Sequence, residues 1–248
     1  MKVLKDVEYG KDEAQRYDVY IPDNKGFKTI IGFHGGGLTG GDKADENYAE
    51  VAASFARAGY CFVSVNYRMY PSAKFPQFIE DCAKAVAHAK GNIEKWGGSG
   101  EIIISGQSAG GYIALFLCFD RHYLADNGVE NEDVSAWVID SAQPTSHFVV
   151  INREDGFDGK RQIIDKHAPL YYVDENVDFS RMLLIYYEND MVCRAEQNLL
   201  LFKAIRAYNQ TAELETVKLS GGHCAGSCIK DENGEYPFVT VALEFLNK

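Results

Sequence analysis

The sequence predicts an α/β domain in which helices cover both faces of a mostly parallel sheet. Apolar runs rich in β-branched residues alternate, along 248 residues, with segments in which apolar residues return every three or four positions. The expected strands cover 16–21, 29–34, 60–67, 101–106, 135–141, 181–187 and 214–219. The expected helices cover 45–58, 77–96, 108–125, 194–208 and 235–246. This strand-helix-strand order is typical of parallel sheets that are buried on both faces.

Length and charge limit the class of protein. A chain of this length can bury the core of one domain, and no repeat or linker divides it, so we expect residues 1–248 to form a single domain. The net charge of -11 disfavours binding to nucleic acid or to anionic membranes. The chain begins with charged residues and has no apolar run of about 20 residues, so we expect no signal peptide and no membrane span. We expect a cytoplasmic protein that acts on a small molecule, in an oligomeric state that the sequence does not indicate.

Segment 143–180 interrupts the alternation of strands and helices. It is long for a connection within one domain and is rich in charged and aromatic residues. Loops of this length often form lids or binding loops. We interpret it as a possible lid, while a surface insertion without a role remains the alternative.

The strongest chemical motif is Gly-Gln-Ser-Ala-Gly at 106–110. It lies between the apolar run 102–104 and a helical pattern that begins near Tyr112. A serine on a sharp turn from strand to helix is held in a strained backbone conformation, and the flanking glycines let neighbouring chains approach. The first amides of the helix favour negative charge at this point. Ser108 is therefore the predicted nucleophile.

A second motif, His-Gly-Gly-Gly at 34–37, directly follows the expected strand 29–34. Successive glycines allow backbone N–H groups to point into a cavity, which is how an oxyanion hole forms without side chains. The predicted donors are Gly36, Gly37 and the N–H of Ala109. The alternative is a flexible turn that continues into the glycines at 40 and 41, but the serine turn on a later strand favours the oxyanion hole.

A serine hydroxyl needs a base and an orienting carboxylate. Asp190 follows the apolar run 182–187, and His223 lies in a glycine-rich loop after the last expected strand. We predict these two as the acid and the base, with Glu188 as an alternative acid. The other histidines fall in helical patterns or in segment 143–180, where they would at most line a pocket: His88, His122, His147 and His167.

No motif indicates a metal or a cofactor. The sequence has no His-Glu-x-x-His, no paired Cys-x-x-Cys, no calcium loop and no phosphate-binding loop. The six cysteines are expected to be free, mostly buried thiols. For Cys224 and Cys228, next to His223, a disulfide or a metal role remains an alternative.

The chain resembles the small microbial carboxylesterases and acetyl esterases of the α/β-hydrolase superfamily that are related to hormone-sensitive lipase. The resemblance covers nearly the whole chain and is carried by His-Gly-Gly-Gly at 34–37 with Gly-Asp-Lys at 41–43, Asn-Tyr-Arg at 66–68, Gly-Gln-Ser-Ala-Gly-Gly at 106–111, and the turns at Asp190 and His223. It implies a serine carboxylesterase that hydrolyses short acyl esters through an acyl-enzyme, with the fold, the triad and the oxyanion donors named above. It also implies that Asn-Tyr-Arg, Phe75-Pro76 and Asp81 belong to the scaffold.

The chain departs from this resemblance at Gln107, where many relatives have histidine or aspartate, and at Leu38, where an aromatic residue is common. The large helical cap of many relatives is also missing, which leaves segment 143–180 as the expected lid. An amide-cleaving relative, such as an arylformamidase or a small peptidase, would use the same residues. An inactive binding module with this fold is a further alternative, which the intact Ser108, Asp190 and His223 disfavour.

Overall fold

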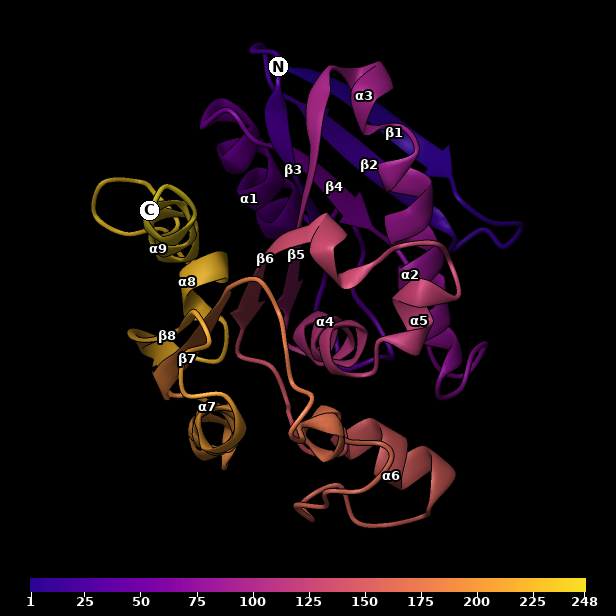
Figure 1. Ribbon diagram of the computed structural model, residues 1–248, viewed down its shortest axis with the longest axis vertical. Helices are drawn as coiled ribbons and strands as arrows, with labels where there is room; N and C mark the ends of the chain where they lie inside the picture. The colour runs from indigo at the N-terminus through magenta and orange to yellow at the C-terminus, as the bar shows by residue number, and fades with distance from the viewer.

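An eight-stranded sheet forms the centre of the structure, a computed structural model that describes residues 1–248 (Figure 1). The strand order is β1-β2-β4-β3-β5-β6-β7-β8, and only β2 runs against the others. The strands are β1 (Lys2–Glu8), β2 (Arg16–Ile21), β3 (Phe27–Phe33), β4 (Cys61–Val65), β5 (Gly98–Gln107), β6 (Val134–Asp140), β7 (Met182–Asn189) and β8 (Leu214–Gly222). The predicted α/β class and its mostly parallel sheet are confirmed.

All seven predicted strands are present, whereas β1 was not predicted. Its side chains are exposed or half-buried throughout, and it pairs with β2 along only one edge. An exposed edge strand has no need for the apolar run that identifies a buried strand. The signal used for the other strands is therefore absent from Lys2–Glu8.

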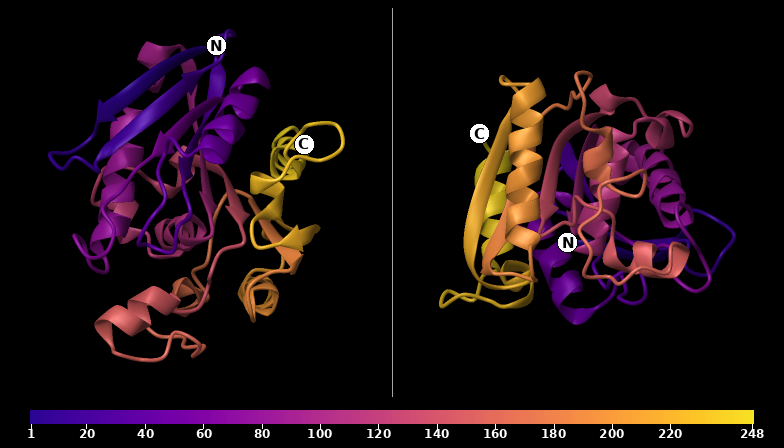
Figure 2. Two further views of the ribbon diagram at one scale, coloured as in Figure 1. Left: turned by 180° about the vertical axis from the view of Figure 1, so that it is seen from behind. Right: turned by 90° about the horizontal axis from the view of Figure 1, so that it is seen from below.

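Helices cover both faces of the sheet, as Figures 1 and 2 show. One hydrophobic cluster joins the sheet to α1 (Glu46–Arg57) and α9 (Pro237–Leu246), and a larger one joins it to α2 (Gln77–Lys90), α4 (Ala109–Phe119) and α7 (Arg194–Tyr208). The predicted helix 77–96 ends at Gly91 and resumes as α3 (Ile93–Trp96). The predicted helix 108–125 is likewise divided into α4 and α5 (His122–Ala125).

The parallel strands bring distant segments together at one edge of the sheet. Strands β3, β5, β6, β7 and β8 run in one direction, so their carboxyl ends lie along the same edge. Ligands in open α/β sheets bind at this edge. The motifs that follow β3, β5, β7 and β8 are therefore neighbours in space.

The scaffold residue Asp81, on α2, has a fully buried side chain. It accepts hydrogen bonds from Arg68 Nε at 2.8 Å and Nη2 at 2.7 Å, and from Gln15 Nε2 at 2.7 Å. A paired guanidinium satisfies a buried carboxylate with two parallel bonds. This pair fixes α2 to the segment after β4, in agreement with the scaffold role that the resemblance implies.

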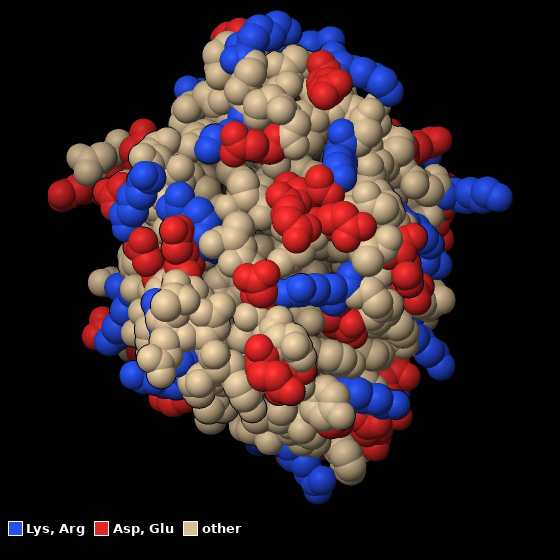
Figure 3. All heavy atoms as spheres, in the orientation of Figure 1, with Lys and Arg blue, Asp and Glu red and all other residues tan.

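Segment 143–180 forms α6 (Phe148–Glu154) and the short 3₁₀ helix η2 (Pro169–Tyr172), with irregular backbone between them. It lies beyond α4, at the bottom of Figure 1. On the face drawn in Figure 3, acidic and basic side chains alternate without a continuous basic groove. The structure contains no helix with the length and apolar character needed to cross a membrane.

Candidate active site

Ser108 occupies a strained turn between β5 and α4, with φ of 53° and ψ of -111°. A non-glycine residue in such a conformation costs on the order of 1–3 kcal/mol. A Cβ atom at Gly106 would lie 2.2 Å from the carbonyl oxygen of Gly110, and one at Gly110 would lie 2.1 Å from that of Phe33. Both glycines are required because α4 packs directly on the strands. The backbone N–H of Ser108 donates to the carbonyl of Asp140 at 2.8 Å.

The structure brings Ser108, His223 and Asp190 into one hydrogen-bonded chain. Ser108 Oγ lies 2.7 Å from His223 Nε2, and His223 Nδ1 lies 2.6 Å from Asp190 Oδ1. Nδ1 faces a carboxylate and therefore carries the ring proton, which leaves Nε2 free to accept from Ser108. The Asp190 side chain is 1% exposed and that of His223 is 26% exposed. Asp190 is thus shielded from water, while His223 reaches the surface.

Ser141, which directly follows β6, is a fourth member that the sequence did not predict. Its hydroxyl donates to Asp190 Oδ2 and lies 2.9 Å from His223 Nδ1. The buried Arg194 holds Ser141 in place by donating from Nη1 to its carbonyl at 2.7 Å. A polar residue at the end of a buried strand was the available signal, but nothing in the local sequence distinguishes it from a turn residue.

The environment of Asp190 favours its ionised form. Burial alone raises the pKa of this carboxyl, but hydrogen bonds from His223 and Ser141 outweigh burial and bring its pKa below the ordinary value. An ionised partner stabilises a protonated imidazole. The exposed alternative, Glu188, lies 3.8 Å from Lys218 and makes no hydrogen bond to His223.

The loop after β3 places backbone N–H groups beside Ser108. Gly36 has φ of +108° and Gly37 has φ of +63°. A Cβ atom at Gly36 would lie 1.9 Å from the carbonyl oxygen of Gly40, and one at Gly35 would lie 3.3 Å from Ser108 Cβ. The N–H groups of Gly36, Gly37 and Ala109 donate no hydrogen bond to another backbone group.

Two pockets lie near this centre. One, of about 440 Å³, touches Ser108 and His223, and its polar lining residues include Asp45, Asn47 and Gln107. The other, of about 510 Å³, is lined by Phe148, Met191, Val192, Asp158, Gly159, Lys160, Gln162, Gln143, Arg194 and Gln197. Phe148 connects the second pocket to the loop after β3, because its ring would lie 3.5 Å from a Cβ atom at Gly37. Leu38 lines neither pocket because it is fully buried in the core.

Only one end of segment 143–180 lies at this centre. Phe148 lies beside Gly37, whereas η2 packs along α4 through a contact of 5.7 Å between the rings of Phe116 and Tyr172. The two apolar ends of the segment therefore line different pockets. A pocket of about 470 Å³ does adjoin Tyr171 and Tyr172, but it lies at the far end of α4, beside Cys118 and Phe119.

All six cysteines are free thiols in the structure. Cys61, Cys82, Cys118 and Cys224 are buried, as expected, but Cys228 is exposed. Burial raises the pKa of the Cys224 thiol well above its ordinary value, so this sulfur stays protonated. The alternative of a disulfide between Cys224 and Cys228 is not realised.

Comparisons with known proteins agree with this geometry. A model of the BD-FAE family matches residues 17–205. The chain belongs to the BD-FAE family, a family of α/β-hydrolase esterases. The resemblance noted from the sequence is thereby confirmed at the level of the superfamily.

Individual relatives of this BD-FAE protein are also described as esterases. Esterase LipC of Mycobacterium tuberculosis is 35% identical over 227 residues, which cover 82% of this chain and 55% of LipC. The chain thus spans about half the length of this curated relative. Esterase B of Lactobacillus Rhamnosis has a TM-score of 0.79 at 17% identity, with 99% of this chain and 84% of that chain covered. A truncated carbohydrate esterase from gut microbiota has a TM-score of 0.78 at 19% identity, covering 100% of this chain and 96% of that chain.

Beneath the centre of this BD-FAE protein lies a second buried carboxyl group, Asp140, at the end of β6. It accepts hydrogen bonds from Tyr187 Oη at 2.8 Å and from Ser227 Oγ at 2.8 Å. Ser227 in turn accepts from Gln107 Nε2 at 2.7 Å. Because Ser227 lies on α8 (Ala225–Cys228), this network connects the residue before Ser108 to the segment after His223.

Asp140 also titrates abnormally. Its burial raises its pKa to about 6, and the hydrogen bonds from Ser227 and Tyr187 and the nearby His223 only partly oppose this effect. The group is fully buried and has no cationic partner within hydrogen-bonding distance. Ionising it is therefore costly.

We predict that Asp140 makes the folded protein less stable as pH rises. A carboxyl whose pKa is raised to about 6 contributes most stability below its ordinary pKa, and that contribution is lost as pH rises through about 6. Between about pH 4 and pH 8 the loss should be about 2–3 kcal/mol, at about 1.4 kcal/mol per unit of pKa. Urea unfolding of the wild type and of Asp140→Asn across this range measures it, since the amide does not titrate. A difference in unfolding free energy that stays constant with pH would contradict the prediction.

Proposed function

We propose that this BD-FAE protein is a serine carboxylesterase that hydrolyses short acyl esters of polar alcohols. The observation that carries the proposal is the chain of hydrogen bonds from Ser108 Oγ to His223 Nε2 at 2.7 Å and from His223 Nδ1 to Asp190 Oδ1 at 2.6 Å. The same residue order along the chain is typical of α/β-hydrolases. The descriptions of LipC and Esterase B as esterases support the same reaction.

In the first step His223 Nε2 accepts the proton of Ser108 as Oγ attacks the ester carbonyl. Asp190 holds the imidazole in the required tautomer and stabilises its positive charge. The carbonyl oxygen becomes an anion, which the N–H groups of Gly36, Gly37 and Ala109 bind; in support, these groups donate no hydrogen bond to another backbone group. His223 then donates its proton to the departing alcohol, and an acyl-enzyme remains on Ser108.

In the second step water takes the place of the alcohol. His223 removes a proton from water, the resulting tetrahedral intermediate collapses, and Ser108 regains its proton as the acid leaves. The side chain of His223 is 26% exposed, which is consistent with access of water to its Nε2 atom. No cofactor takes part in either step.

The residues that line the two pockets support the proposed substrate, an ester of a short acyl group and a polar alcohol. The pocket that touches Ser108 and His223 is lined by Asp45, Asn47 and Gln107, which match the hydroxyl groups of a polar alcohol. On the other side of Gly37, Phe148 offers a small apolar contact for the acyl group. The second pocket is lined by Met191 and Val192 as well as Phe148, with Asp158 and Lys160 among its polar residues.

Ser108→Ala should abolish labelling by a fluorophosphonate probe and lower esterase turnover on the order of 10⁴-fold or more, because the nucleophile is lost. The fold should persist, since alanine fits the same turn. Mass spectrometry of the labelled protein measures the adduct, and circular dichroism measures the fold. Wild-type labelling of the folded variant would exclude Ser108 as the nucleophile.

The two acidic candidates can be separated by matched amides. Asp190→Asn should lower kcat by up to about 10⁴-fold, because the amide does not stabilise the imidazolium ion. Glu188→Gln should have little effect, since Glu188 makes no contact with His223. Steady-state kinetics on one nitrophenyl ester tests both variants, and a larger loss in Glu188→Gln would assign the acid to Glu188.

Catalytic efficiency on matched nitrophenyl esters should peak at acetyl to butyryl and fall by octanoyl. Long acyl chains gain affinity only where their methylenes leave water, at roughly 0.8 kcal/mol per CH₂. In the second pocket Phe148, Met191 and Val192 share the lining with the charged Asp158 and Lys160, which we expect to break a continuous apolar wall. A formyl amide in the same panel tests the amide-cleaving alternative. A maximum at octanoyl, or a preference for the amide, would overturn the proposed substrate class.

A further inference from the structure

We propose that Asp155, Asp165 and His167 form a binding site for one divalent transition-metal ion, of which Zn²⁺ is the best match. The three residues lie in segment 143–180. The site stands independently of the proposed ester hydrolysis. It also departs from the expectation of no metal site, which rested on the absence of known metal-binding motifs.

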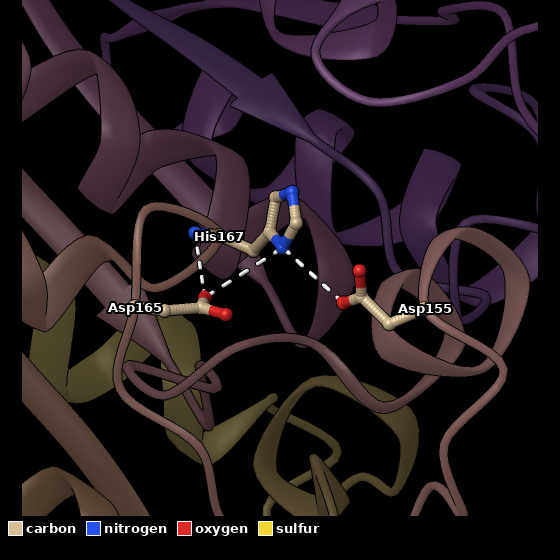
Figure 4. Close-up of side chains that lie close together, drawn as sticks. All are labelled: Asp155, Asp165 and His167. Carbon is tan, nitrogen blue, oxygen red and sulfur yellow. Dashed lines mark hydrogen bonds and ion pairs between the residues drawn. The ribbon is translucent and has the colours of Figure 1, made fainter.

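The donor atoms of the three residues lie close together. One ligand atom from each residue lies within 4.8 Å of the other two. In Figure 4 both carboxylates face the same ring nitrogen, and His167 Nδ1 is 3.5 Å from Asp155 Oδ2 and 3.6 Å from Asp165 Oδ1. These distances are too long for good hydrogen bonds. They are close to the separation of roughly 3.3–3.5 Å between neighbouring ligands of a tetrahedral ion with bonds of about 2.0–2.1 Å.

The imidazole of His167 supplies a second, independent observation. The residue is only 7% exposed, and its Nδ1 atom is buried without a hydrogen-bond partner. A buried polar atom without a hydrogen-bond partner destabilises the fold, because its lost hydration is not replaced. Nδ1 points between the two carboxylates, as Figure 4 shows, so a cation there would give it a ligand bond.

Neighbouring groups hold two of the ligands in position. Asp165 Oδ1 accepts from Ser146 Oγ at 2.7 Å and from the N–H of His167 at 2.9 Å. The ring of His167 packs edge-on against Phe75 at 4.8 Å, and its carbonyl accepts from Tyr112 Oη at 2.7 Å. Such second contacts orient the ligands of metal sites. Because the Asp155 side chain is 30% exposed, the same arrangement leaves a path for the ion.

The donor set indicates the class of metal. One imidazole nitrogen and two carboxylates suit Zn²⁺ and similar transition metals, whereas Ca²⁺ and Mg²⁺ prefer six or more oxygen ligands. Three protein ligands leave a fourth position for water. The ion would also compensate two of the acidic groups of a chain with a net charge of -11.

The metal would close the irregular loop 155–167. Asp155 caps the carboxyl end of α6, while Asp165 and His167 belong to the turn that Tyr112 ties to α4. The loop between them contributes Asp158, Gly159, Lys160 and Gln162 to the second pocket. A bound ion would therefore fix one wall of that pocket, and its primary effect would be on the stability of segment 143–180.

The test uses the full chain, freed of metal by a chelator and titrated with Zn²⁺ by calorimetry. We expect one equivalent to bind and to raise Tm, and Co²⁺ in its place to give the visible absorption bands of a tetrahedral ion. Asp155→Asn and His167→Gln should each weaken Zn²⁺ binding by at least about 10–100-fold, the loss typical of disturbing even the outer contacts of a metal site. His122→Gln is the matched control, because His122 is exposed and has a single carboxylate partner, Asp120.

Because His167 is buried, a loss of Zn²⁺ binding in His167→Gln would also follow from misfolding. Asp155→Asn changes a partly exposed carboxylate, so it tests the site without that complication. The chelated protein and both variants should label with the Ser108 probe as the wild type does, which separates this site from the proposed ester hydrolysis. Absence of saturable Zn²⁺ binding by the wild type would overturn the proposal. Wild-type affinity in Asp155→Asn or in His167→Gln would also overturn it, because the ion would then be held elsewhere.

Discussion

The close packing of α4 on β3 and β5 is the constraint on which the rest of the centre depends. Neither Gly106 nor Gly110 has room for a Cβ atom, since each such atom would come within about 2 Å of a backbone carbonyl. This contact forces Ser108 into its strained conformation and brings Gly35 to the side of its Cβ atom. Side chains at these glycines would move the nucleophile and the N–H groups apart together.

Two carboxyl groups near His223 show how neighbours decide ionisation. Both Asp190 and Asp140 are buried, yet the pKa of Asp190 is lowered and that of Asp140 is raised to about 6. Burial raises both, but only Asp190 is hydrogen-bonded to His223, whereas Asp140 is held by the hydroxyl groups of Tyr187 and Ser227. A pair of acids with separated pKa values is typical of catalytic centres. Here the lowered pKa belongs to the acid that touches the imidazole.

The sequence predicted the features that depend on the burial of strands and on the positions at which strands end. Six of the seven predicted strands contain a run of buried residues, and the half-buried β8 was identified as well, whereas the exposed β1 was missed because it lacks an apolar run. Ser108, Asp190 and His223 were predicted to lie together because each follows a strand and parallel strands end at one edge of the sheet, and the structure joins them by hydrogen bonds. Ser141 and Asp140 were missed, although both lie at the end of β6. Their roles come from side-chain contacts with residues far along the chain, which no local pattern encodes.

Segment 143–180 shows the same limit in an irregular region. Its two apolar ends look alike in sequence, but Phe148 reaches Gly37 whereas Tyr172 packs on Phe116. Which end approaches the centre is decided by the path of the chain between them. That path is held by contacts such as the hydrogen bond from Tyr112 to the carbonyl of His167. The spacing of apolar residues contains no information about such a contact.

The structure gives a physical reason for the glutamine at position 107, which the resemblance alone does not explain. Its amide donates to Ser227 Oγ, and Ser227 donates to Asp140, so each hydrogen of this chain points toward the buried carboxyl group. An aspartate at 107 would be an acceptor facing Ser227, and Ser227 would then have to abandon either it or Asp140. It would also add a negative charge near a carboxyl group whose pKa is already raised. A neutral donor meets both requirements, and it links the strained serine turn to α8 without changing the charge around His223.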